Sequence, residues 1–175
     1  MTMFGDLIDS IEGLDDEFEE RPAELEDFIS TGYLELDTGR HFVLSDYQKD
    51  IIEHSTQIYK LETLVRLYGE KEGKRRHART KREIICMLGK GSGKDLMAEI
   101  SCAYLVHKLL CLKDPSAYFG KPPDDAIDIV NVAVNADQAQ RVFFKGFTNM
   151  IKNSPWFKDK VVSPKQRVYE FVKSV

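Results

Sequence analysis

The sequence lacks any uninterrupted apolar run near the roughly 20 residues that a membrane-spanning helix needs. Its N-terminus carries Asp6 and Asp9 and has no basic segment of the kind that opens a secretory signal peptide. Cysteine is scarce: Cys86, Cys102 and Cys111 are odd in number, and no two of them have the C-x-x-C spacing. These absences predict a cytosolic protein with buried free thiols, and they exclude a disulfide framework or a zinc site.

Positive charge is nearly absent from residues 1–37, which hold 13 acidic side chains and one basic side chain, Arg21. Apolar residues recur between these acids at a spacing near 3.6, which is typical of amphipathic helices. We expect one helix to begin at Pro22, since proline suits the first helical position, and to end at Gly32. The sequence therefore predicts an acidic helical appendage over residues 1–37 and a second domain over residues 38–175.

Basic side chains gather instead in residues 66–82, which hold eight Lys and Arg and only two acids. Such a run attracts the phosphates of nucleic acid through counterion release. A solvated loop whose charge merely prevents association is the alternative interpretation. We expect residues 69–82 to form a loop. The predicted DNA-binding residues are Arg75, Arg76 and Arg79.

Two kinds of apolar pattern alternate in the rest of the chain. Apolar residues at helical spacing predict helices. Short continuous apolar runs predict strands that are buried on both faces. The predicted helices span residues 46–68, 94–112 and 136–152. The predicted strands span residues 84–88, 127–134 and 167–172. This alternation is typical of an α/β fold with a mostly parallel sheet and flanking helices.

The sharpest motif is LGKGSGKD at residues 88–95, where the first predicted strand meets a helix. Gly89, Gly91 and Gly93 permit positive φ angles, so that several backbone N–H groups turn inward. The helix start adds partial positive charge, and Lys94 reaches the outer phosphates of a nucleotide. A plain strand-to-helix turn would explain the glycines but not this lysine. The motif predicts a Walker A loop that binds ATP.

Two positions depart from the Walker A consensus. Leu88 stands where the consensus has glycine, and Asp95 stands where it has the hydroxyl that ligates Mg²⁺. We expect Asp95 to bind the ion through its carboxylate, directly or through water, or to leave this role to other groups. An additional negative charge beside phosphates is costly without the metal, so nucleotide affinity should depend strongly on Mg²⁺.

A glutamine upstream of the loop has two interpretations. Gln48, in the segment FVLSDYQ, offers both a donor and an acceptor to adenine. It also forms a capping box with Ser45 at the start of the first predicted helix. Asn135 and Gln138 raise a similar choice between a ligand site and a helix cap. The predicted nucleotide-binding residues are Gln48, Gly89, Lys90, Gly91, Ser92, Gly93, Lys94 and Asp95.

The chain resembles the large terminase subunit, the DNA-packaging motor of tailed bacteriophages. Residues 42–48 resemble the adenine-binding motif of that family, and residues 89–95 resemble its Walker A loop with an additional basic residue at Lys90. Residues 130–144 resemble the following strand and helix of its ATPase core. The resemblance implies a P-loop ATPase with Lys90 and Lys94 as catalytic residues and ATP and Mg²⁺ as cofactors.

The resemblance also implies partners and a place in the cell. The partners are double-stranded DNA, a portal protein, the small terminase subunit and other copies in a ring. The place is the host cytoplasm, at the procapsid portal. The apolar run at 127–134 is followed by Asn135, Ala136 and Asp137 rather than by the Asp-Glu pair of a Walker B strand. We therefore expect a partial ATPase domain that is truncated before Walker B and turns over poorly.

Two other classes stay open. Some P-loop nucleoside and nucleotide kinases carry a Ser-Gly-Lys-Asp run. Two features count against a kinase. The loop lies late in this chain, and no arginine-rich lid follows the second predicted strand. A DNA-binding module with a degenerate P-loop is supported by the basic segment and by both departures from the consensus.

Overall fold

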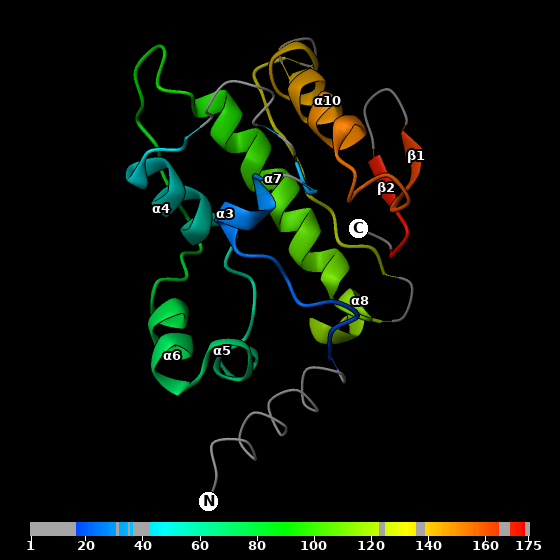
Figure 1. Cartoon of the computed structure of the whole chain (residues 1–175). Helices are drawn as coiled ribbons and strands as arrows, with labels where there is room; N and C mark the ends of the chain where they lie inside the picture. Colours follow the sequence, from blue (N-terminus) through cyan, green and yellow to red (C-terminus); the bar gives the residue numbers. More distant parts are fainter. Residues whose placement is uncertain are drawn as a thin grey trace, which may run out of the picture.

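A computed structural model of the chain describes residues 17–30, 32–34, 36, 43–122, 125–135, 139–164 and 169–173. Helices form most of its regular structure, and Figure 1 shows them arranged around one long helix. The helices are α3 (Leu25–Phe28), α4 (Asp46–Ser55), α5 (Leu61–Tyr68), α6 (Glu70–Ala78), α7 (Lys94–Cys111), α8 (Pro115–Tyr118), the π-helix η1 (Ala139–Phe144) and α10 (Lys145–Asn153). The strands are β1 (Val161–Pro164) and β2 (Tyr169–Phe171).

Helix α7 is the central element of the core and confirms the helix predicted over residues 94–112. It is apolar on several sides, because α4 and α10 both pack against it. Ile100, Ala103 and Leu110 are fully or almost fully buried. Burying one large apolar side chain contributes about 1.5–3 kcal/mol, so this helix supplies much of the folding energy. Among the described helices, none has the length and apolar character needed to cross a membrane.

The single helix predicted over residues 46–68 is wrong, because the chain forms α4 and α5 with a break between them. The Thr56 hydroxyl donates a hydrogen bond to the carbonyl of Ile52 (2.8 Å), which closes the last turn of α4. Tyr59 then turns inward, where its hydroxyl donates to the carbonyl of Lys108 in α7 (2.8 Å). A tertiary contact thus interrupts a pattern that is continuous in the sequence.

The loop predicted over residues 69–82 is also wrong for most of its length, since α6 occupies residues 70–78. Carboxylates three or four positions before basic residues stabilise this helix, as in the pair between Glu70 and Lys74 (2.5 Å). Gly73 packs against the backbone of α5, where a Cβ would come within 2.6 Å of the Val65 nitrogen. Much of the charge run therefore lies on two helices, α5 and α6, that pack together.

The described sheet differs from the predicted parallel one. The sheet in the described residues has two strands, β1 and β2. They pair antiparallel, with Val161 opposite Phe171. Strand β2 falls within the strand predicted at 167–172. The segments 84–88 and 127–134 form no regular structure and have no strand partner among the described residues. An inner strand needs neighbours on both edges, and no described segment supplies them.

Most side chains of these two segments are also exposed, contrary to the prediction that they are buried. The side chains of Ile85 and Met87 are 79% and 94% exposed, and Val134 is 94% exposed. Cys86 lies on the first segment and is exposed, whereas Cys111 is buried as predicted. All three cysteines are free thiols, as the sequence predicts.

The helix predicted over residues 136–152 is confirmed from residue 139 onward, although it begins as the π-helix η1 before continuing as α10. Residues 136–138, which include Gln138, lie outside the described residues. The helix predicted to begin at Pro22 is the short α3, which begins three residues later, at Leu25. Gly32 follows it with φ of 95°, a left-handed conformation that suits the predicted terminator.

The described part of the acidic N-terminal segment packs onto the core. Phe18 forms a bridge with Leu112, and Leu25 and Phe28 are buried against α7. The amphipathic helices expected over residues 1–16, and Phe42 of the upstream motif, lie outside the described residues. The boundary between residues 37 and 38 stays a prediction.

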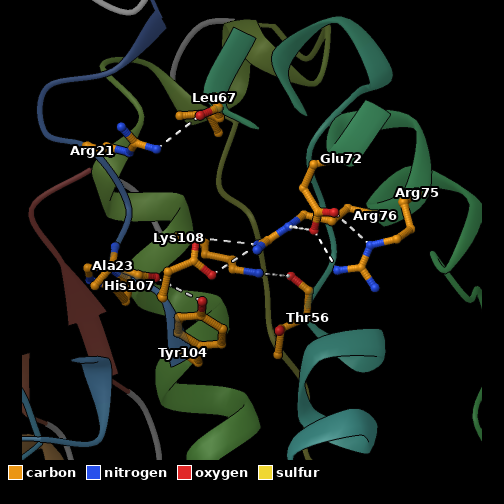
Figure 2. Close-up of polar contacts among 11 residues, drawn as sticks. Arg21, Ala23, Thr56, Leu67, Glu72, Arg75, Arg76, Tyr104, His107 and Lys108 are labelled. Carbon is orange, nitrogen blue, oxygen red and sulfur yellow. Dashed lines mark hydrogen bonds and ion pairs between the residues drawn. The ribbon is translucent and has the colours of Figure 1, made fainter. Parts of the chain in front are cut away.

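A buried polar cluster fastens this segment to α7 (Figure 2). The Ala23 N–H donates to His107 Nε2 (3.0 Å), and the Tyr104 hydroxyl donates to the Ala23 carbonyl (2.8 Å). Lys108 Nζ donates to the Thr56 carbonyl (3.1 Å) and thereby ties α7 to the end of α4. Burial lowers the pKa of His107 to about 3 and the pKa of Lys108 to about 8. The histidine is therefore neutral at pH 7 and can accept the Ala23 hydrogen bond.

The buried histidine predicts acid sensitivity. The unfolded chain binds a proton on this ring near pH 6.5, whereas the folded chain binds it only near pH 3, so the free energy of unfolding falls as pH drops through this range. The His107 contribution should fall by about 2 kcal/mol between pH 7 and pH 5. We expect His107→Gln to show a shallower decline than the wild type in urea unfolding from pH 7 to pH 4.

The exposed His77 on α6 provides the control, because His77→Gln removes a histidine without touching the core. Equal pH profiles for His107→Gln and His77→Gln would contradict this account of the buried ring.

Candidate nucleotide-binding site

The loop of residues 89–95 forms a tight turn that leads directly into α7. Gly91 and Gly93 have φ of 82° and 76°, left-handed values that other residues rarely adopt. The Ser92 N–H lies 3.4 Å from the Gly89 carbonyl, which marks the turn. The sequence prediction that glycines provide this geometry is confirmed at two of the three positions.

The N-terminus of α7 opens at the end of this turn. Gly93 precedes the first helical residue, Lys94, and has no side chain with which to cap the N–H groups of the first turn. These groups and the helix dipole make the helix start electropositive. The side chains of Lys90, Lys94 and Asp95 are all exposed at this end of the helix. Two cations and a row of backbone donors thus surround the turn, which suits a bound anion.

Gln48 reaches the loop from α4. Its Nε2 donates to the Ser92 carbonyl (3.2 Å), across 44 positions in the sequence. Its Oε1 accepts from the Ser45 N–H (2.9 Å), and Ser45 Oγ accepts from the Gln48 N–H (3.3 Å). The predicted capping box is therefore confirmed. The predicted adenine contact is untested, although the structure places Gln48 beside the phosphate loop.

Glu99 is a buried carboxyl near the loop that the sequence analysis did not find. It lies one helical turn after Asp95, is only 9% exposed, and faces Gly146 of α10. A Cβ at position 146 would overlap the Glu99 carboxylate, so the glycine makes room for it. Burial, and secondarily the Asp95 charge, raises the pKa of Glu99 to about 7. The sequence shows both Glu99 and Gly146. That they face each other can be recognised only once α7 is known to pack against α10.

The donor set for a metal ion is small. Asp95 supplies one exposed carboxylate, and in the described ranges no three His, Cys, Asp or Glu side chains lie together as a metal site. Mg²⁺ commonly binds through one or two carboxylates together with phosphate oxygens and water. Asp95 fits this pattern, and any Mg²⁺ held here would depend on the oxygens of a bound nucleotide.

The three predicted DNA-binding arginines lie on or just after α6, away from the start of α7 (Figure 1). Each has an acidic partner: Arg75 pairs with Glu72 (2.6 Å), and Arg79 pairs with Asp50 (2.5 Å). Arg76 pairs with Glu24 (3.0 Å) and stacks 3.8 Å from the Tyr68 ring centroid. Arg76 therefore helps to hold the fold together, while Arg75 is the most exposed of the three.

A comparison with protein families matches residues 3–173 to the family described as the N-terminal P-loop domain of the uncharacterized protein MJ0330. Because the match covers nearly the whole sequence, the chain belongs to this P-loop family. Searches of curated proteins and of solved structures found no match. The family match agrees with the loop geometry and supports nucleotide binding in general. It does not distinguish a packaging motor from a kinase.

The Glu99 carboxyl predicts a second pH effect, of opposite sign to that of His107. Between pH 4.5 and about 7 the folded chain binds a proton here that the unfolded chain has released, so stability falls as pH rises. We expect Glu99→Gln to raise the free energy of unfolding by about 3 kcal/mol at pH 8 and by about 1 kcal/mol at pH 5. Urea unfolding at both pH values measures this difference.

Glu53→Gln is the control, since Glu53 is exposed on α4. If Glu99→Gln gave the same stability change at pH 5 and pH 8, the raised pKa would be refuted.

Proposed function

We propose that the loop of residues 89–95 binds the phosphates of a nucleoside triphosphate. The observation that carries this proposal is the left-handed turn at Gly91 and Gly93 leading into the uncapped start of α7. Backbone N–H groups in such a turn form a concave anion site, and Lys94 adds a charge within reach of the outer phosphates. The family match supports the same assignment.

We assign Mg²⁺ to the same site, with Asp95 in the place of the usual hydroxyl. The ion would supply charge neutralisation on the phosphates when bound. Asp95 would orient it directly or through water. Without the ion, the Asp95 charge opposes phosphate binding, so Mg²⁺ dependence should be steep.

The finer proposal is the ATPase of a terminase large subunit, which moves double-stranded DNA into a procapsid. It is supported by the order of the motifs, by Lys90 within the loop, and by the bond from Gln48 to the loop. Under this proposal Lys90 and Lys94 stabilise charge during hydrolysis. The portal protein, the small subunit, further copies in a ring, and the host cytoplasm belong to the same proposal. A P-loop nucleoside or nucleotide kinase is equally consistent with the family match.

We infer that residues 84–88 and 127–134 are inner strands of a larger sheet. Their apolar side chains, such as Met87 and Val134, are exposed, which is unfavourable by about 25 cal/mol per Å² of apolar surface. In the terminase proposal, a strand that ends in an acidic Walker B pair would join this sheet, and the pair would activate water.

Replacing Lys94 tests the nucleotide proposal. Lys94→Ala removes a charge-assisted contact to phosphate, so Mg·ATP affinity measured by calorimetry should fall about tenfold or more. Lys71→Ala is the matched control, because Lys71 is exposed on α6. Equal affinity for wild type and Lys94→Ala would contradict the proposal.

The two finer functions separate in one assay. A packaging motor should hydrolyse ATP faster when double-stranded DNA is added, whereas a kinase should transfer phosphate to a nucleoside monophosphate and ignore DNA. The assay therefore scores both products, inorganic phosphate and nucleoside diphosphate made from the monophosphate.

The DNA contact predicted for α6 is tested by a gain of affinity. Glu72 accepts hydrogen bonds from Arg75 and Arg76, which lower its pKa to about 2, so it neutralises this face at all ordinary pH values. Glu72→Gln should strengthen binding to duplex DNA. Arg75→Gln should weaken binding and lower the slope of log affinity against log salt concentration by about one unit, the value for one lost phosphate contact. Fluorescence anisotropy at several salt concentrations measures both.

Glu62→Gln on α5 makes the same charge change elsewhere and serves as the control. If Glu72→Gln and Glu62→Gln bind DNA alike and Arg75→Gln keeps the wild-type slope, α6 does not bind DNA.

A further inference from the structure

Gln48 makes contacts that fix the orientation of its amide. Its Oε1 accepts from the Ser45 N–H at 2.9 Å, so the oxygen faces the start of α4. The amide is planar, and its NH₂ group therefore faces the other way, toward the Ser92 carbonyl at 3.2 Å. The capping box thus determines which atom of Gln48 meets the phosphate loop.

The loop approaches Gln48 closely at one position. A Cβ on Gly93 would lie 3.0 Å from Gln48 Nε2, and Gly93 has φ of 76°. A side chain at position 93 is therefore opposed both by the backbone conformation and by the glutamine amide. Ser92 and Gly93 are the two residues that share the peptide bond in contact with Gln48.

The direction of one carbonyl sets the direction of the next N–H. The peptide between Ser92 and Gly93 is trans, and in a trans peptide the C=O and N–H point in opposite directions. Because the Ser92 carbonyl accepts from Gln48 Nε2, the Gly93 N–H points away from Gln48. This N–H belongs to the set of donors that would face the phosphates.

We propose that Gln48 is a positioning residue that orients the Ser92–Gly93 peptide for phosphate binding, whatever base the nucleotide carries. Gln48 is held on a helix of the core, because α4 packs on α7 and Ile52 of α4 is fully buried. The proposal rests on the proposed function of the loop. It differs from the adenine hypothesis, in which Gln48 contacts the base and does not affect the affinity for the phosphates.

The experiment compares two substitutions at position 48 with one in the cap. Gln48→Leu removes the donor without adding charge, and Gln48→Glu keeps the acceptor of the capping box but has no donor for Ser92. Ser45→Ala weakens the cap and leaves the bond from Gln48 to the loop. Calorimetry with Mg·ATP, Mg·GTP and Mg·tripolyphosphate gives affinities, and thermal unfolding gives the melting temperature.

Gln48→Leu should bind all three ligands about fivefold more weakly, the factor that one neutral hydrogen bond provides. Gln48→Glu should also weaken all three, but its added charge opposes the phosphates as well, so the uncharged Gln48→Leu decides the outcome. Ser45→Ala should lower the melting temperature and keep the affinities. A loss confined to Mg·ATP would overturn the proposal in favour of the adenine contact, and unchanged affinities would overturn it outright.

A second measurement separates this proposal from the proposed function. The Met97 N–H donates to the Gly93 carbonyl at 2.9 Å, so its hydrogen exchange reports on the first turn of α7 without any ligand. If wild type binds none of the three ligands, the nucleotide proposal fails. Faster Met97 exchange in Gln48→Leu than in Ser45→Ala would still support positioning, and equal exchange in these variants would overturn it.

Discussion

The burial of α7 is the constraint on which the rest of the structure depends. This helix contributes buried side chains to the core along its length, and the phosphate loop leads directly into its first turn. Helices α4 and α10 pack on it, and the N-terminal segment is fastened to it through His107 and Tyr104. Because the helix is held on several sides, the direction of its first turn, and hence of its free N–H groups, is fixed by the whole core.

Polar groups buried along this helix are stabilised in different ways. His107 stays neutral and accepts a backbone hydrogen bond, while Lys108 donates to the Thr56 carbonyl and lies 4.4 Å from the Tyr104 ring centroid. Glu99 has only the space that Gly146 leaves, and its pKa rises toward neutrality. A carboxyl that is partly protonated near pH 7 places less negative charge beneath the loop than an ionised one, which favours an anion above it.

Local signals were enough to predict the phosphate loop and α7, because glycine spacing and apolar periodicity act over a few residues. The break after α4 could not be predicted in this way, since it depends on Tyr59 meeting the Lys108 carbonyl of a distant helix. Helix α6 was mistaken for a loop because its stability comes from ion pairs and from Gly73 fitting against α5. Strand partners are also distant in sequence, so the apolar runs at 84–88 and 127–134 predicted strands that the described residues do not form.

The turn before α7 is proposed to bind the phosphates of a nucleoside triphosphate. Titrating ¹⁵N-labelled protein with Mg·ATP and following the backbone amide resonances tests it most directly. We predict saturable shifts at Gly91, Gly93 and Lys94, with little change at Gly73 in α6. Shifts centred on α6, or no saturable shift in the loop at millimolar Mg·ATP, would contradict the account.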